Sequence, residues 1–134
     1  MVPRRLWDSN LVISYLSGDH SIQPDCDLII ARAERGELEI MVSTIAEAEV
    51  AYLEGFSDAD AEARIREFFS RSYVVPASYD RPVAAIARRL IRTYRPGFKP
   101  EDAVHMATAL LWHIPILETT DRDLLKLDGR EGNP

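Results

Sequence analysis

The sequence predicts a single α/β domain built on a parallel sheet, and three observations support this. Short apolar or β-branched segments alternate with longer segments of helical periodicity along the chain. A length of 134 residues suits one domain with one substantial core. The sequence contains no internal repeat, low-complexity tract or linker. We therefore expect one domain over residues 1–134, with helices flanking a central sheet.

The expected elements follow from apolar periodicity and from capping residues. Strands are predicted to end at residue 7 and to cover residues 38–42, 73–75 and 114–117. Helices are predicted over residues 11–16, 26–34, 44–53, 60–71, 81–94 and 100–112, with a short helix over 121–127. Asp80 is the expected cap of its helix, and Pro82 lies near the first position, where proline is tolerated. We expect Pro76 to close the third strand.

Composition limits the compartment and the classes of partner. No apolar run approaches the roughly 20 residues that a membrane span needs, and no apolar segment typical of a signal peptide follows the N-terminus. A single cysteine, Cys26, cannot form an internal disulfide, which favours a reducing compartment, so we expect a cytoplasmic protein. The net charge of −6 does not attract a phosphate chain unless it is neutralised locally, for example by bound divalent cations. Acidity that serves only solubility is the commoner explanation.

Two aspartates occupy the ends of predicted strands. Asp8 follows the first strand, and Asp121 follows the strand over residues 114–117. In parallel sheets, ligands bind beyond the carboxyl ends of the strands, so both carboxylates are expected at the same edge of the sheet. Each residue also has an ordinary structural explanation, because aspartate is a common helix N-cap.

The helix predicted over residues 44–53 contains two glutamates that we separate by helical phase. Thr44 and Glu47 match a capping box, which explains Glu47 structurally. Glu49 falls within the apolar stripe formed by Ile45 and its helical neighbours, where a carboxylate is costly unless it is paired or bound to a metal. A partly exposed position at the edge of the stripe is an equally good explanation of Glu49.

Asp102 lies in the first turn of the helix predicted over residues 100–112. The helix dipole stabilises an acid there, which is a sufficient structural explanation. If Asp102 nevertheless joins Asp8, Glu49 and Asp121, four carboxylates meet and repel one another. Mg²⁺ or Mn²⁺, which prefer oxygen ligands, would remove that repulsion and could assist phosphodiester cleavage.

Four ordered segments resemble the PIN-domain nucleases, and particularly the VapC-type toxins of bacterial toxin–antitoxin pairs. They are LWDSN (6–10), VSTIAEAEV (42–50), PEDAVHMATA (100–109) and LETTDRDL (117–124). No single segment is decisive, but the ordered set spans almost the whole chain. The resemblance implies a PIN-like three-layer fold, with a central parallel sheet flanked by helices.

The resemblance also implies a site. Its acids are Asp8, Glu49, Asp102 and Asp121, which would bind Mg²⁺ or Mn²⁺ and carry the catalysis, with Ser9, Thr119 and Asp123 in support. Trp7 and Leu124 depart from the residues frequent in the family, but both exchanges are apolar and leave the chemistry intact. Such toxins cut RNA endonucleolytically, form homodimers and are held inactive by a small cognate antitoxin.

Two other functions stay open at this point. A non-catalytic PIN-like module that only binds RNA or protein is the first alternative, although an intact acidic set disfavours it. A phosphatase or phosphotransferase that uses Asp8 as nucleophile is the second. Its usual motif needs another acid two residues later, where this chain has Asn10.

Basic residues offer a tentative RNA contact. At 3.6 residues per turn, one helix face carries Arg81, Arg88, Arg92 and Arg95, which could follow an RNA backbone. A solvated helix face is the commoner meaning of such a stripe. His105 lies one turn after Asp102, which could bring it near the site, but we interpret it as a buried or half-exposed structural histidine, the commoner explanation. His20, Cys26 and His113 show no zinc-ligand spacing.

Overall fold

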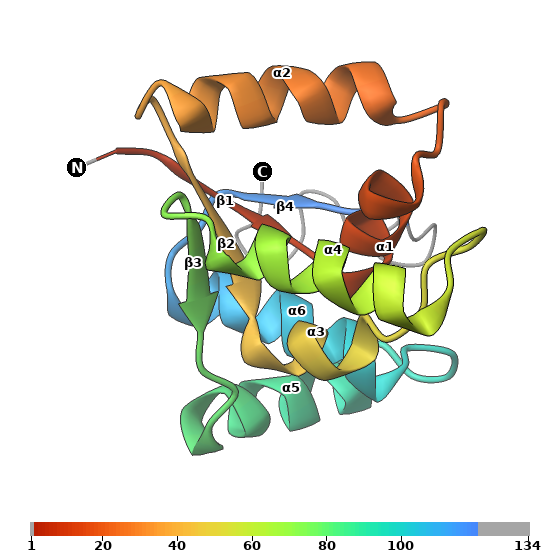
Figure 1. Ribbon diagram of the computed structural model, residues 1–134. Coiled ribbons are helices and arrows are strands. Elements are labelled where there is room, and N and C mark those ends of the chain that lie inside the picture. Colours follow the sequence, from red (N-terminus) through yellow and green to blue (C-terminus); the bar gives the residue numbers. More distant parts are fainter. Residues whose placement is uncertain (1, 121–134) are drawn as a thin grey trace.

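The protein, seen here as a computed structural model, forms a parallel sheet between layers of helices (Figure 1). The structure describes residues 2–120. Its strands are β1 (Arg4–Trp7), β2 (Glu39–Ser43), β3 (Val74–Ala77) and β4 (Ile116–Glu118). Its helices are α1 (Ser9–Ser17), α2 (Gln23–Glu34), α3 (Thr44–Glu49), α4 (Asp58–Ser70), α5 (Arg81–Thr93) and α6 (Pro100–Leu111). None of these helices is long and apolar enough to cross a membrane.

The strand order places the two ends of the chain's described part side by side. The sheet runs β3-β2-β1-β4, and every pairing in it is parallel. The chain moves outward from β1 to β2 and β3, then returns past β1 to form β4. The order therefore reverses between β1 and β4, and the carboxyl ends of these two strands are where a ligand crevice is expected.

Alternating side chains divide the core between the two faces of the sheet. Trp7 and Ile40 point into a cluster shared with α1, α2 and α4. Their neighbours Leu6 and Met41 point to the opposite face, where they pack with Ala109 of α6. Successive residues of a strand point to opposite faces of the sheet, so both sets must be apolar when both faces are covered by helices. Figure 1 shows the result, with α2 and α5 on opposite sides of the sheet.

Helix α6 is enclosed, because it lies between α5 and the sheet. All residues from 102 to 109 are buried. Its outer neighbour α5 buries one apolar stripe against it, formed by Val83, Ala87 and Leu90. Because α6 packs on both sides, side chains that project from its first turns are held on a rigid support.

The structure corrects three boundaries. Pro76 lies inside β3, opposite Val42, and does not close the strand. Proline is tolerated there because β3 is an edge of the sheet that residues 2–120 form, where one row of amides has no partner strand. The helix expected over residues 44–53 ends at Glu49, and its N-cap is Ser43, which accepts a hydrogen bond from the amide of Ile45. The predicted capping box of Thr44 and Glu47 was therefore wrong.

Candidate active site

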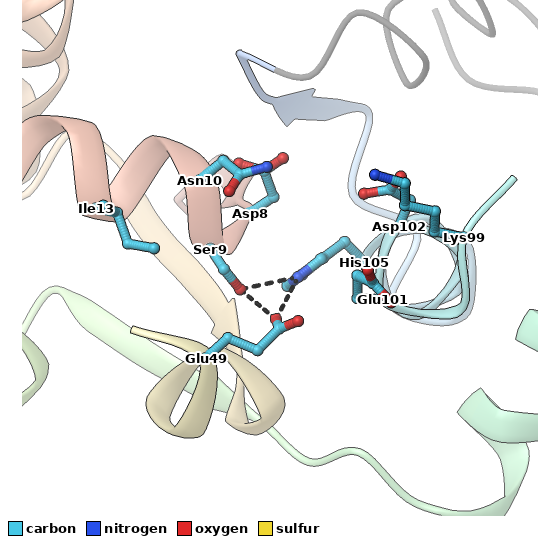
Figure 2. Close-up of a pocket in the computed structure, with 9 residues that line it drawn as sticks. All are labelled: Asp8, Ser9, Asn10, Ile13, Glu49, Lys99, Glu101, Asp102 and His105. Carbon is cyan, nitrogen blue, oxygen red and sulfur yellow. Dashed lines mark hydrogen bonds and ion pairs between the residues drawn. The ribbon is translucent and has the colours of Figure 1, made fainter. Parts of the chain in front are cut away.

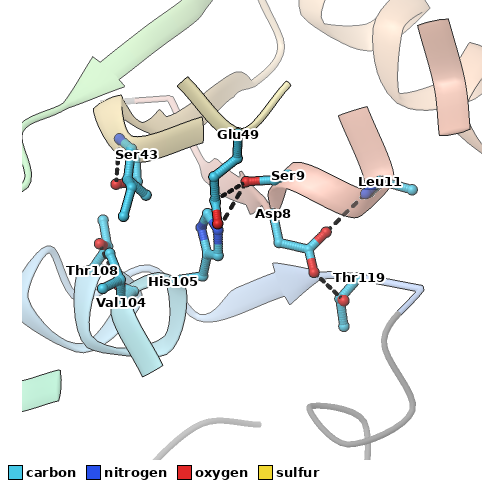
Figure 3. A network of polar contacts seen from close by, with 10 residues as sticks. Asp8, Ser9, Leu11, Ser43, Glu49, Val104, His105, Thr108 and Thr119 are labelled. Atoms are coloured by element: carbon cyan, nitrogen blue, oxygen red, sulfur yellow. Dashed lines mark hydrogen bonds and ion pairs between the residues drawn. The ribbon is translucent and has the colours of Figure 1, made fainter. Parts of the chain in front are cut away.

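Asp8 lies where β1 passes into α1, at the point where the strand order reverses. Its Oδ1 accepts a hydrogen bond of 2.9 Å from the amide of Leu11, so it caps α1 as expected. Its Oδ2 accepts a hydrogen bond from the hydroxyl of Thr119, the residue that follows β4 (Figure 3). Only 2% of Asp8 is exposed. The carboxylate is thus fixed in orientation by the first turn of α1 and by the residue that follows β4.

Glu49 is the last residue of α3, and its side chain reaches toward α1 and α6. Its Oε1 accepts a hydrogen bond from the Ser9 hydroxyl and lies 3.2 Å from Nε2 of His105 (Figure 2). Ser9 Oγ and the same Nε2 are 3.1 Å apart, which closes a triangle of contacts. The hydrogen bond from His105 is the main cause that lowers the pKa of Glu49, although burial opposes it. Glu49 is therefore ionised at neutral pH.

Asp102 lies in the first turn of α6, with 4% of its surface exposed. The N-cap of this helix, Lys99, makes no capping hydrogen bond through its side chain. The amino end of a helix carries partial positive charge, which stabilises an acidic side chain in this turn. Figure 2 shows Asp102 and Lys99 across the cavity from Ser9 and Glu49.

One cavity of about 410 Å³ brings these groups together. It is lined by Asp8, Ser9, Asn10, Ile13, Glu49, Lys99, Glu101, Asp102 and His105. Three of the four predicted acids therefore reach one cavity from three different elements. Glu101 adds a fourth carboxylate, whereas Lys99 is the only permanently charged cation among the described lining residues. The wall is strongly acidic.

The donor set suits a hard divalent cation, because it supplies carboxylate oxygens and no thiol. Within residues 2–120, however, no three His, Cys, Asp or Glu side chains are grouped closely enough to hold an ion. The other two predicted acids, Asp121 and Asp123, lie outside the described residues. The described acids therefore line one cavity without forming a complete ligand set among themselves.

Glu49 lines the cavity and Glu47 does not, but the position of Glu49 on an apolar helical stripe is not the cause. Tyr52 lies within the predicted helix over residues 44–53, at helical spacing from Ile45, but it is 76% exposed because the helix ends before it. Glu47 is exposed on the outside of α3, and Ala48 is exposed too. Glu49 enters the cavity because it is the last helical residue and faces Ser9 and His105.

His105 was interpreted as a structural histidine, and the structure places it in the site. It is buried, with 2% of its surface exposed, and it contacts both Ser9 and Glu49. Its position three residues after Asp102 puts the two side chains on the same face of α6. That spacing was a usable signal in the sequence. Lys99 and Asn10 carried no comparable signal.

The arginine stripe lies away from the core. Arg81, Arg88 and Arg92 are exposed on α5, on the side opposite its buried apolar stripe, and Arg95 is exposed just after the helix. None of the four lines the acidic cavity as the described residues form it. Exposure on the outer face of α5 is compatible with contact to RNA and equally with a solvated helix face.

Comparison with known proteins agrees with this architecture. A solved structure described as VapBC2 from Rickettsia felis bound to a DNA fragment from their promoter superposes with a TM-score of 0.69. The alignment covers 95% of each chain at 14% sequence identity, so the likeness is one of fold. No curated protein matches the sequence. The family model of the PIN domain matches residues 6–130. The chain therefore belongs to the PIN-domain family, whose members are generally nucleases.

Proposed function

We propose that this protein is an endoribonuclease that requires Mg²⁺ or Mn²⁺. The observation that carries the proposal is the convergence of Asp8, Glu49 and Asp102 on one cavity beside the carboxyl ends of β1 and β4. These acids come from three elements that are far apart in sequence. Buried carboxylates of this kind are costly to a fold unless a cation is bound near them.

The proposed ligands are Asp8, Glu49, Asp102 and Asp121, which would hold one or two ions. A bound ion of this type lowers the pKa of a water molecule and stabilises the charge that develops on the phosphate. Thr119 and Ser9 each donate a hydrogen bond to one of these carboxylates, so they fix the orientation of the ligands. We assign a similar supporting role to Asp123.

We further propose that the protein is the toxin of a type II toxin–antitoxin pair. Its resemblance to VapC-type toxins and the fold shared with VapBC2 support a small cognate antitoxin as its partner. A homodimer in the cytoplasm is the form in which we expect it to act. We assign contact with the RNA backbone to Arg81, Arg88, Arg92 and Arg95, because they form an exposed basic stripe.

The nuclease proposal is tested by cleavage of a mixed RNA pool. We expect the wild-type protein to cleave RNA with Mn²⁺ or Mg²⁺ and to stop when EDTA is added. Asp8→Asn and Glu49→Gln should abolish cleavage. Glu47→Gln is the matched control, because Glu47 lies on the same helix but is exposed outside the cavity. Equal cleavage by all four proteins would show that a contaminant is responsible.

The toxin proposal is tested separately, by expression in bacteria. Wild-type protein should arrest growth, and Asp8→Asn should not. If a small open reading frame adjoins its gene, co-expression of that frame should relieve the arrest. If cells that express the wild-type protein grow normally, the protein is not a toxin, and this part of the proposal is contradicted. The nuclease proposal would be unaffected.

A further inference from the structure

We infer that His105 is a positioning residue for Glu49: together with Ser9 it holds Oε1, so that Oε2 is the oxygen presented to a cation. This inference rests on the proposed function, because it concerns how Glu49 is oriented as a metal ligand. Its evidence is the triangle of contacts among Ser9, Glu49 and His105, which joins α1, α3 and α6 (Figure 2).

The hydrogen bonds determine which atom carries each proton. The Ser9 hydroxyl has one hydrogen, and it is donated to Glu49 Oε1. Toward His105, the Ser9 oxygen and the ionised carboxylate can therefore only accept. Nε2 of His105 must then carry a hydrogen, which it shares between acceptors at 3.1 and 3.2 Å. His105 is a donor at this point of the site.

Ser9 and His105 both contact the same oxygen of Glu49. Ser9 and His105 approach Oε1, whereas Oε2 receives no hydrogen bond from the described part of the chain. The two donors reduce the charge available on Oε1 and fix the plane of the carboxylate. Oε2 keeps its full capacity as an acceptor, which is what a cation ligand needs.

The local structure explains why Glu49 needs such a tether. It is the last residue of α3, a helix of six residues, so no following helical turn packs beside its side chain. His105, in contrast, projects from the enclosed helix α6 and is 2% exposed. Helix α6, through His105, therefore orients the side chain of Glu49, which α3 itself does not support.

The other ring nitrogen argues against a purely structural role for His105. Among the described residues, Nδ1 is buried without any hydrogen-bond partner, which destabilises the folded protein. A leucine would fill the same space without that cost. The histidine is therefore better explained by what Nε2 does for Glu49 than by packing. Groups that carry such local costs are typical of functional sites.

Three substitutions separate the donor from the bulk of the side chain. In His105→Gln, the side-chain amide nitrogen takes roughly the place of Nε2 and can still donate to Glu49. In His105→Asn, the shorter chain places the amide near the position of Nδ1, away from Glu49. His105→Leu keeps the volume and removes every donor. The Gln and Asn variants therefore have the same polar group and differ in where its N–H donor lies.

The primary readout is Mn²⁺ affinity without RNA, measured by titration calorimetry and by the EPR signal of free Mn²⁺. Loss of a group that orients a metal ligand typically weakens metal binding about 10- to 100-fold, and we expect this for Leu and Asn. Glutamine should restore affinity to within about threefold of wild type, since the donor to the ligand is kept. In RNA cleavage at saturating Mn²⁺, kcat should fall more than KM changes.

The outcomes separate the inference from the proposed function. Wild-type protein that neither binds Mn²⁺ nor cleaves RNA overturns the proposed function, and this inference with it. If the wild-type protein binds Mn²⁺ and cleaves RNA, two results overturn only the role of His105. In the first, all three variants bind Mn²⁺ as tightly as the wild type. In the second, the Gln variant binds Mn²⁺ as weakly as the Leu variant. Thermal melting establishes that each variant folds. If the leucine variant does not fold, the comparison of Gln with Asn decides.

Discussion

Two glutamates with nearly the same exposure have opposite surroundings in this protein. The side chain of Glu118, on β4, is 25% exposed, and that of Glu49 is 26% exposed. Glu118 accepts a hydrogen bond of 2.9 Å from the Trp7 indole and forms an ion pair of 3.3 Å with Arg5. Glu49 accepts from the Ser9 hydroxyl and from His105, and no arginine or lysine lies within ion-pairing distance of it in the described residues.

Because burial is equal, the partners decide what each acid can do. The negative charge of Glu118 is balanced within the fold by a guanidinium that is always charged. Glu49 has its orientation fixed, but its donors include no permanent cation. The first arrangement stabilises the contact between β1 and β4, and the second leaves negative charge available to a ligand. The comparison therefore distinguishes an acid whose charge is balanced within the fold from an acid that has no permanent cation beside it among the described residues.

The largest expected effect is on catalysis. Glu49→Gln should lower metal-dependent RNA cleavage by more than about 100-fold, because loss of a ligand should exceed the 10- to 100-fold cost of losing a ligand's outer partner. Glu118→Gln should leave cleavage within about threefold of wild type, because Glu118 lies outside the acidic cavity and such substitutions usually change stability by little. Initial rates at saturating Mn²⁺ measure both. If Glu118→Gln is as inactive as Glu49→Gln, the distinction between the two acids is lost.

The fold was largely predictable, because its signals are local and repeated. Helical and strand periodicities placed every strand and helix in the described part of the chain, and Asp80 caps α5 as expected. Boundaries failed where the context of the whole sheet overrides local preference. Pro76 is a local sign of a strand end, yet it lies within β3 because that strand is at an edge.

The sequence indicated which acids share the cavity but not which contacts they make. The strand-end rule indicated Asp8, the resemblance to the PIN domains indicated Glu49 and Asp102, and all three line the same cavity. Which hydrogen bonds these acids accept depends on how α1, α3 and α6 meet, and sequence spacing within one element does not encode that. His105 was therefore interpreted as a structural histidine, although it contacts both Ser9 and Glu49.

The second effect is on stability, and it should appear at the other glutamate. Glu118→Ala leaves the indole N–H of the buried Trp7 without its acceptor, which should cost about 1–3 kcal/mol of the free energy of unfolding. Glu118→Gln keeps an acceptor for the indole and loses only the ion pair with Arg5, so it should cost about 0.2–1 kcal/mol. Urea denaturation of the metal-free proteins measures both. An equal loss in the two variants would mean that the indole contact contributes nothing.

The smallest effect is a dependence of stability on pH that arises at Glu49. Its pKa lies below the ordinary value of 4.5 in the folded protein, chiefly because His105 donates to the ionised form. The folded state therefore binds this proton less readily than the unfolded chain does. The stability from this group is present above the unfolded pKa and is lost as pH falls through the folded pKa.

Glu49→Gln removes that titration while keeping an amide oxygen that can accept from Ser9 and His105. Unfolding in urea with EDTA, between pH 3 and pH 7, should show wild-type stability falling more steeply with acid than that of the variant. Parallel curves would mean that the contacts to Oε1 do not favour the ionised carboxylate. Because burial opposes the hydrogen bonds at this group, only part of their effect survives in the difference between the curves. A measurable difference would therefore show that the donors outweigh burial and keep Glu49 charged without metal.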